Sequence, residues 1–330
     1  MHVTSENNRF IKKESTLYSK WFKPALRTSL VFFLMLNMLT IFHAYRFTHF
    51  VEHALEKTHD PKGLTAIQKI NTMILGVKNP RPENTSTPTG KYETIVLHSN
   101  HEIECWSCKT ENAKGTIMLL HGYGGCKSDM LDKADVFLQL GYNAFLIDFM
   151  GSGGSEGRQT TIGFMEAEQV RTGFEYLRKQ GEKNIYIFGT SMGAAAAMKA
   201  INDYAIQPRA IILECPFGSI YQTVCARFRM MQIPEMPLAG LLVFWGGLIN
   251  GFWAFSHQPE VYAGKITCPS LLLYGARDEK VSREEIDRIF QNLKGQRTFI
   301  EYKQAGHENY LSKVRKTWIN DVRSFLKLNE

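Results

Sequence analysis

The chain contains 330 residues, 44% of them hydrophobic, which is enough to bury a large core in one catalytic domain with an appended segment. Its formal net charge is +7, but the first 27 residues hold six Lys or Arg and two Glu and account for +4 of it. A basic excess confined to one end is typical of membrane orientation and of contact with anionic lipid, and it gives no indication of nucleic-acid binding.

An uncharged stretch, Thr28–Tyr45, follows the basic segment. Its 18 residues would form a helix about 27 Å long, close to the hydrocarbon thickness of a bilayer. We therefore expect residues 1–27 to be a basic cytoplasmic tail, residues 28–45 a single transmembrane anchor, and the rest of the chain to lie on the non-cytoplasmic side, in a periplasm, cell exterior or lumen. A cleaved signal peptide is the alternative, but His43-Ala44-Tyr45 lacks the small residues of a cleavage site, which favours an uncleaved signal anchor.

Residues 46–91 are expected to form a stalk and a linker. Residues 47–78 show a helical pattern that suits a membrane-proximal stalk. Residues 79–90 are rich in Pro, Thr and Asn and lack apolar side chains, which is typical of a linker. The catalytic domain would then comprise residues 92–330.

The domain itself alternates short apolar runs with helical patterns. Near-continuous apolar strands separated by helices predict an α/β fold with a mostly parallel sheet covered on both faces. Helical patterns are clear over 165–179 and 284–293. The expected strands include 95–97, 117–120, 144–147, 185–188, 211–213, 271–273 and 297–302.

Several of these strands end in loops that contain candidate catalytic residues. Residues 121–125, His-Gly-Tyr-Gly-Gly, form a loop able to turn a backbone N–H toward a nucleophile. Residues 189–193, Gly-Thr-Ser-Met-Gly, place Ser191 on a strand-to-helix turn with small neighbours, as a nucleophile elbow requires. Asp278 and His307 each follow a later strand, so the chain order is Ser, Asp, His.

This order and these loops resemble the α/β-hydrolase superfamily, over residues 92–330, and in particular its serine-aminopeptidase-like and monoacylglycerol-lipase-like branches. The resemblance implies that Ser191 is the nucleophile, His307 the general base and Asp278 its orienting carboxylate. It further implies an oxyanion hole formed by the backbone N–H groups of Tyr123 and Met192, and no cofactor. Residues 148–157 are similar to the family pattern D-x-R-G-x-G-x-S, with Met150 in place of the usual Arg.

Two assignments have rivals within the sequence. Glu214 also ends a strand and competes with Asp278, although the acid in this fold most often follows the later strand. His121 lies in the first loop, where we expect it to hold the loop rather than to take part in the reaction.

The six cysteines leave the compartment open. Cys105 and Cys108 are three residues apart on an expected strand, so their side chains should face opposite sides, and no second pair completes a zinc site. We therefore predict no metal. Disulfides are compatible with an exported domain, but their pairing is unreadable from the sequence.

A second uncharged run, residues 236–255, lies between Ser191 and the other two members of the candidate triad. A membrane crossing there would separate the triad across the bilayer, so we expect a helical lid insertion at about 217–262 instead. Its apolar side chains would cover the active site, contact lipid or pack on the domain. The residues concerned are Leu238, Leu241, Leu242, Phe244, Trp245, Leu248, Phe252 and Trp253.

These features predict a membrane-anchored serine hydrolase that cleaves a carboxylic ester of a hydrophobic or acylated, lipid-like substrate through an acyl-enzyme. A serine peptidase or aminopeptidase acting on amides is the alternative, because both share every motif above. A catalytically idle hydrolase fold that serves as a binding module is the second alternative. The sequence does not identify protein partners.

Overall fold

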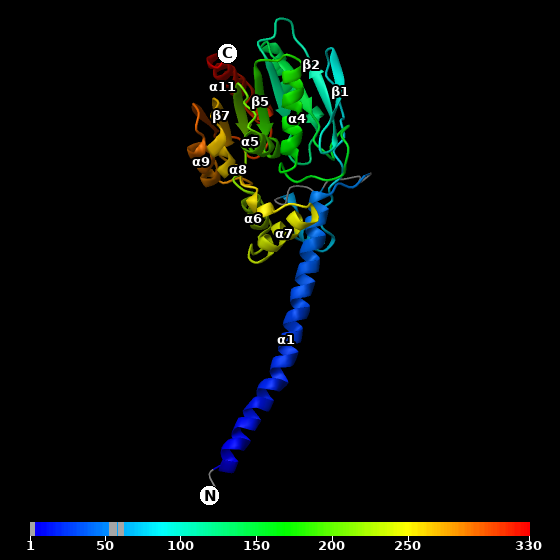
Figure 1. Ribbon diagram of the computed structural model, residues 1–330, viewed down its shortest axis with the longest axis vertical. Helices are drawn as coiled ribbons and strands as arrows, with labels where there is room; N and C mark the ends of the chain where they lie inside the picture. The colour runs from blue at the N-terminus through cyan, green and yellow to red at the C-terminus, as the bar shows by residue number, and fades with distance from the viewer. Residues whose placement is uncertain (1–3, 53–57, 59–62) are drawn as a thin grey trace.

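The computed structural model describes residues 4–52, 58 and 63–330, with side chains from Phe22 onward. It shows an α/β domain from which one long N-terminal helix projects (Figure 1). Residues 1–3 of the expected basic tail lie outside the described residues.

An eight-stranded sheet forms the centre of the domain, in the order β1-β2-β4-β3-β5-β6-β7-β8. The strands from β4 to β8 along this order are parallel, whereas β1 and β2 pair antiparallel with each other and β2 with β4. Their bounds are β1 Tyr92–His98, β2 Glu102–Cys108, β3 Thr116–Leu120, β4 Asn143–Ile147, β5 Ile185–Thr190, β6 Ala210–Glu214, β7 Ser270–Gly275 and β8 Arg297–Tyr302. The prediction of a mostly parallel sheet is confirmed.

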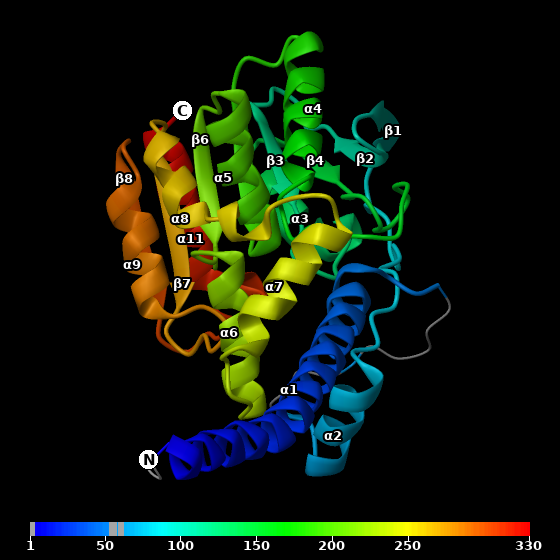
Figure 2. The ribbon, with the colours of Figure 1, turned by 60° about the horizontal axis from the view of Figure 1, so that its bottom comes forward.

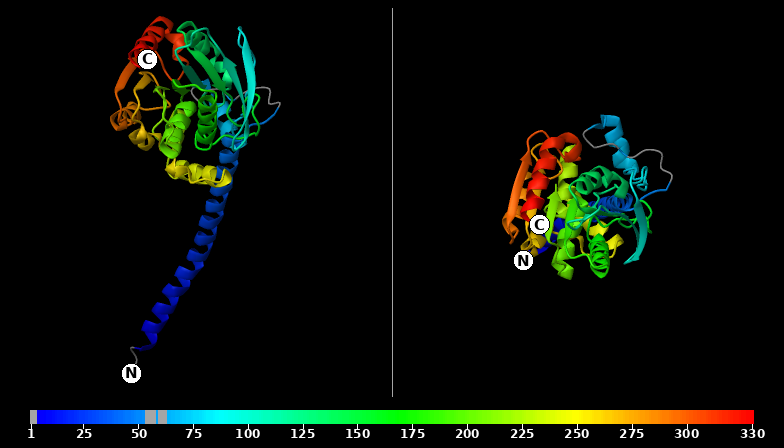
Figure 3. Two further views of the ribbon diagram at one scale, coloured as in Figure 1. Left: turned by 45° about the horizontal axis from the view of Figure 1, so that its top comes forward. Right: turned by 90° about the horizontal axis from the view of Figure 1, so that it is seen from above.

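Helices cover both faces of the sheet (Figure 3). One apolar layer packs α4, α5 and α9 against the sheet, and the other packs α3, α10 and α11. The helices are α3 Leu131–Gln139, α4 Glu166–Lys179, α5 Met192–Tyr204, α8 Pro259–Tyr262, α9 Arg283–Asn292, α10 Tyr310–Lys313 and α11 Arg315–Leu328. A buried strand with a helix on each side explains the continuous apolar runs in the sequence.

All six cysteines are free thiols. Cys105 packs in one apolar layer and Cys108 in the other, which is what the two-residue repeat of a strand requires. Within the described residues, no group of three or more His, Cys, Asp or Glu side chains is arranged to hold a metal ion.

The N-terminal helix α1, Thr4–Thr48, is longer than the expected anchor and contains it. Its part Phe22–Thr48 is, among the described residues, the one helix long and apolar enough to cross a membrane. Phe32, Met35 and Met38 are about two-thirds exposed, so the domain does not cover them. This supports a membrane anchor and leaves its orientation open.

The expected stalk is interrupted rather than continuous. Helix α1 ends at Thr48, and a short helix α2, Ala66–Leu75, begins after a capping box between Thr65 and Gln68. The ring Nε2 of His43 bonds the carbonyl of Met73 at 2.8 Å, so α2 returns to lie against α1. Residues 53–57 and 59–62 of the expected stalk lie outside the described residues.

The segment expected to be a linker, residues 79–90, makes hydrogen bonds to the domain. Asn84 Nδ2 donates to Asp148 Oδ2 at 2.8 Å, and the Cys126 thiol donates to the carbonyl of Glu83 at 3.2 Å. The backbone N–H of Gly153 donates to the carbonyl of Pro82 at 2.9 Å. A polar, Pro-rich strip can therefore pair its backbone with loops of the domain as well as with water.

The insertion between β6 and β7 contains α6 Ile220–Met231, α7 Leu238–Ile249 and the 3-10 turn η3 Ala254–Ser256. Helix α7 packs across the end of α1 (Figure 2). Small residues permit this, since a Cβ built on Gly246 would lie 4.0 Å from that of Ala44, and Trp245 Nε1 donates to Asn37 Oδ1 at 2.9 Å. The apolar insertion thus packs partly on the anchor helix, a contact that the sequence did not suggest.

A buried cation holds the loop that follows β4. The Lys127 side chain is fully buried, and its ammonium pairs with the buried Asp148 and, at 2.6 Å, with Glu104. It also lies 4.3 Å from the centre of the Trp106 ring. The second oxygen of Asp148 accepts the backbone N–H of Lys127 at 2.6 Å, so the carboxylate bonds on both sides.

We predict that Lys127→Met lowers the free energy of unfolding by about 3–5 kcal/mol, because it leaves the Asp148 carboxylate buried without its cation. Chemical unfolding of the detergent-solubilised chain measures this. The double variant with Asp148→Asn should recover much of the loss. The control Lys114→Met, which breaks an exposed pair with Glu330, should change stability by about 1 kcal/mol at most. Equal losses of unfolding free energy in Lys127→Met and Lys114→Met would contradict the prediction.

Candidate active site

Ser191 stands on a strained turn between β5 and α5. Its backbone has φ +50° and ψ −109°, a conformation that side-chain-bearing residues rarely adopt. The turn is close to β3, because a Cβ on Gly193 would lie 2.3 Å from the carbonyl oxygen of Leu120. The N–H of Ser191 donates to the carbonyl of Glu214 at 2.8 Å. The surrounding structure therefore holds a conformation that the residue would not choose alone.

The structure brings Ser191, His307 and Asp278 together. Ser191 Oγ lies 3.1 Å from His307 Nε2, and His307 Nδ1 lies 2.8 Å from Asp278 Oδ2. A carboxylate only accepts hydrogen bonds, so Nδ1 carries the proton and Nε2 is free to accept the serine O–H. This arrangement can take the proton from Ser191 and stabilise the imidazolium that results.

Asp278 is fixed by the loop after β7. Its other oxygen, Oδ1, accepts the backbone N–H groups of Lys280 at 2.8 Å and Val281 at 2.9 Å. The Asp278 side chain is buried, whereas His307 keeps partial exposure. The carboxylate is thus oriented toward the imidazole by its own backbone.

The rival carboxylate Glu214 is engaged elsewhere. It is fully buried and accepts hydrogen bonds from Trp318 Nε1 at 3.0 Å and from Thr190 Oγ1 at 3.2 Å. The Lys133 ammonium lies 3.6 Å from it. Glu214 is therefore paired as a buried structural acid beneath the turn that carries Ser191.

Lys133 extends this pairing to the loop that carries His307. Its ammonium donates to Asn309 Oδ1 at 2.8 Å, and Asn309 Nδ2 donates to Asp132 Oδ2 at 2.7 Å. Asn309 lies two residues after His307 and caps α10. No local pattern in the sequence indicates this network, since a lysine in an amphipathic helix and an asparagine in a loop carry no signal of burial.

The loop after β3 passes beside Ser191. A Cβ on Gly122 would lie 3.8 Å from that of Ser191. His121 is fully buried; its Nε2 accepts the N–H of Phe149 at 3.0 Å and its Nδ1 donates to the carbonyl of Gly122 at 2.9 Å. Burial lowers the pKa of His121 and keeps it neutral. As expected from the sequence, His121 holds the loop.

The two expected oxyanion donors belong to two neighbouring segments, the loop after β3 and the start of α5. Tyr123 follows Gly122 in the loop, and Met192 is the first residue of α5. Helix geometry leaves the N–H of a first residue without an intrahelical acceptor, so the N–H of Met192 is available to a ligand. Tyr123 also borders a recess of about 400 Å³ that Gly122, Thr190 and Asn309 help to line.

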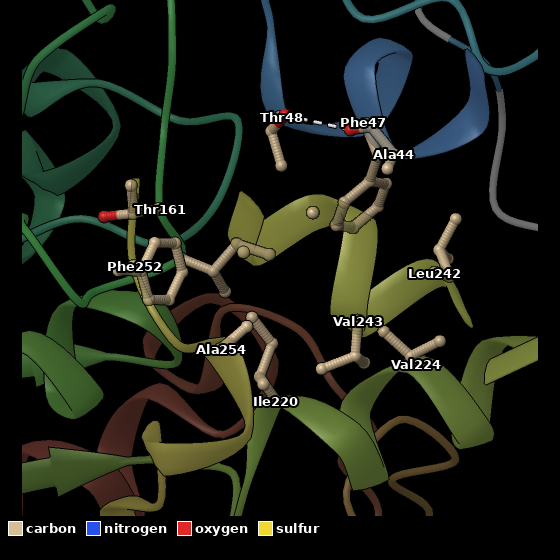
Figure 4. Close-up of a pocket in the computed structure, with 13 residues that line it drawn as sticks. Ala44, Phe47, Thr48, Thr161, Ile220, Val224, Leu242, Val243, Phe252 and Ala254 are labelled. Atoms are coloured by element: carbon tan, nitrogen blue, oxygen red, sulfur yellow. Dashed lines mark hydrogen bonds between the residues drawn. The ribbon is translucent and has the colours of Figure 1, made fainter. Parts of the chain in front are cut away.

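A smaller apolar cavity of about 30 Å³ lies between the end of α1 and the insertion (Figure 4). Ala44, Phe47 and Thr48 of α1 face Leu242, Val243 and Phe252 across it. The space is too small for an acyl chain, so a long substrate would have to displace one of these side chains.

Comparisons with known proteins point to a hydrolase family and to its fold. The family model described as "Serine aminopeptidase, S33" matches residues 111–246. The chain is 24% identical over 230 residues to YqkD of Bacillus subtilis, covering 68% of this chain and 75% of that one. It is 26% identical over 202 residues to lysophosphatidylserine lipase ABHD12 of Danio rerio, covering 59% of this chain and about half (51%) of the relative.

Among solved structures, the chain is similar to the esterase Pf2001 of Pyrococcus furiosus. The TM-score is 0.62 at 22% identity, covering 76% of this chain and 98% of the esterase. At this identity the likeness concerns the fold.

We predict that Asp278→Asn slows labelling of Ser191 by a fluorophosphonate by about 10³–10⁴-fold, because the amide no longer holds the correct imidazole tautomer or stabilises its cation. Glu214→Gln should slow labelling less than about tenfold and should instead lower the melting temperature, since Lys133 would lose its buried partner. Rates of labelling and thermal unfolding on both variants test this. The opposite ranking of the two rates would transfer the orienting role to Glu214.

Proposed function

Because the chain is a member of the α/β-hydrolase superfamily, we propose that it is a serine hydrolase that cleaves a carboxylic ester of a hydrophobic or acylated substrate. The observation that carries the proposal is the chain of hydrogen bonds from Ser191 to His307 and from His307 to Asp278. A serine hydroxyl is a weak nucleophile without such a base.

In the proposed reaction, Ser191 Oγ attacks the ester carbonyl while His307 Nε2 takes its proton. The carbonyl oxygen becomes an oxyanion that accepts hydrogen bonds from the backbone N–H groups of Tyr123 and Met192. The C–O bond then breaks, the leaving alcoholate receives the proton from His307, and an acyl-enzyme remains. Water then attacks the acyl carbon while His307 Nε2 takes its proton, the bond from the acyl carbon to Ser191 Oγ breaks, and His307 returns the proton to Oγ as the carboxylic acid leaves.

The apolar surroundings favour a hydrophobic ester. The cavity between α1 and the insertion is lined by aliphatic and aromatic side chains, and α1 is long and apolar enough to hold the enzyme at a membrane. A relative with 26% identity is named as a lysophosphatidylserine lipase, which suits the same substrate class. Acyl esters of amphiphilic lipids meet these conditions.

A serine peptidase is the second candidate, because the matching family model is described as a serine aminopeptidase. An aminopeptidase needs an acidic group facing the substrate amine. Asp129 is an acid among the residues that line the recess beside Tyr123, and it accepts the backbone N–H of Cys126 at 3.1 Å. A carboxylate can accept further hydrogen bonds, so Asp129 is the group that a substrate amine would meet if the chain is a peptidase.

We further propose that α1 is an uncleaved anchor with its N-terminus in the cytoplasm. Lys20, Lys23 and Arg27 precede the apolar stretch, and basic residues are retained on the cytoplasmic side. The domain would then lie on the non-cytoplasmic face.

The test compares esters with amides. We expect the full chain in detergent to hydrolyse p-nitrophenyl acyl esters of graded chain length with kcat/KM well above that for aminoacyl p-nitroanilides. Ser191→Ala should abolish both turnover and fluorophosphonate labelling while leaving the melting temperature nearly unchanged, since one hydroxyl contributes little to packing.

Three outcomes would decide against the proposal. Preference for the anilides would favour the peptidase. Absence of both labelling and turnover in the wild type would favour a non-catalytic binding module. Turnover by Ser191→Ala equal to that of the wild type would remove Ser191 from the mechanism.

A further inference from the structure

The side chain of Tyr123 meets the C-terminal end of α1. Its hydroxyl donates to the main-chain carbonyl of Phe47 at 2.7 Å. Its ring stacks on the Phe47 ring, with 4.8 Å between centres and 14° between planes. One residue of the loop beside Ser191 is therefore held by α1, 76 positions earlier in the chain.

The contact pairs a helix-end carbonyl group with a buried hydroxyl donor. Phe47 is in the last turn of α1, where carbonyl groups lack an intrahelical donor. Its oxygen accepts the Tyr123 hydroxyl and, at 3.2 Å, the side-chain amide of Asn79. Burial raises the pKa of Tyr123, so the hydroxyl stays protonated and remains a donor.

The insertion adds a third partner. The guanidinium of Arg227, on α6, lies 4.9 Å from the centre of the Phe47 ring and 5.9 Å from that of Tyr123. A cation over stacked rings is an attractive arrangement. Anchor, insertion and loop therefore meet at one cluster, which we define as Phe47, Tyr123 and Arg227.

The Tyr123 side chain adds a contact at the middle of the loop. The start of the loop is fixed by β3 and the buried His121, and its end by Asp129, whose carboxylate accepts the N–H of Cys126. Between them the N–H of Gly125 donates to the carbonyl of Gly122 at 3.2 Å and closes a turn around Tyr123. The Tyr123 side chain ties this turn to α1 and so helps to set the position of its backbone.

We infer that the last turn of α1 is a positioning element of the active site, in which Phe47 holds Tyr123 so that the backbone N–H of Tyr123 faces the oxyanion. The inference rests on the proposed function, because its effect is on turnover by Ser191. Phe47 touches no reacting atom and acts through Tyr123. The helix that anchors the enzyme thus also completes the catalytic site.

The experiment uses the full chain in detergent with a short p-nitrophenyl ester, and kcat is expressed per active site titrated with fluorophosphonate. Tyr123→Phe removes the hydroxyl but keeps the ring and the N–H. Phe47→Ala removes the ring but keeps the carbonyl. We expect each to lower kcat by about 5–20-fold with KM within about twofold, because an oxyanion donor acts in the transition state. The double variant should lose less than the product of the single losses.

Matched controls separate the expected loss of kcat from a general effect of removing a ring or a hydroxyl. Phe33→Ala makes the same change on an exposed part of α1, and Tyr204→Phe makes the same change at an exposed tyrosine on the far end of α5. Both should keep the wild-type kcat. A fall in melting temperature without a fall in kcat per site for Tyr123→Phe and Phe47→Ala would mean that the contact is only structural, and would overturn the inference.

The two proposals fail in different ways. A wild-type chain that neither turns over the ester nor labels at Ser191 would overturn the proposed function. An active wild type whose Tyr123→Phe and Phe47→Ala variants match their controls in kcat, or change KM alone, would overturn the positioning role and leave the proposed function intact.

Discussion

The close approach of α5 to the ends of β3 and β5 is the constraint on which the candidate site depends. Ser191 keeps a positive φ only because the strand before it and the helix after it are packed rigidly. Gly193 makes this packing possible, since any side chain there would collide with the carbonyl of Leu120. The strained turn exposes the serine hydroxyl at the sheet edge, where His307 and the loop of Tyr123 reach it.

Because the strands are parallel, the other candidate catalytic residues and the loop of Tyr123 lie at the same edge of the sheet. Strands β5, β7 and β8 end in the loops of Ser191, Asp278 and His307, and β3 ends in the loop of Tyr123. Carboxyl ends of parallel strands lie together, so residues 116 positions apart come within hydrogen-bond distance. Two buried lysines, Lys127 and Lys133, hold the loops on this edge through paired carboxylates.

Helix α1 makes direct contacts with the insertion and with the loop beside Ser191, which a flexible tether would not do. Its last turn packs on α7 through Ala44 and Gly246 and bonds the loop through Phe47 and Tyr123. The nearly filled apolar cavity lies in the same seam. Helix α1, the insertion and the loop therefore share the contacts around Phe47.

The sequence by itself determined which strands end in loops with candidate catalytic residues, because apolar runs followed by Gly-rich turns encode local structure within a few residues. It thereby predicted the sheet, the elbow at Ser191 and the positions of Asp278 and His307. It left Glu214 as a rival to Asp278, because their partners come from distant segments: Asp278 contacts His307, whereas Glu214 is buried against Trp318 and Lys133. The docking of residues 79–90 and the contact of Phe47 with Tyr123 were likewise decided by the tertiary structure. Such contacts join backbone carbonyls and polar side chains far apart in the chain, and no local periodicity records which partner a carbonyl will meet.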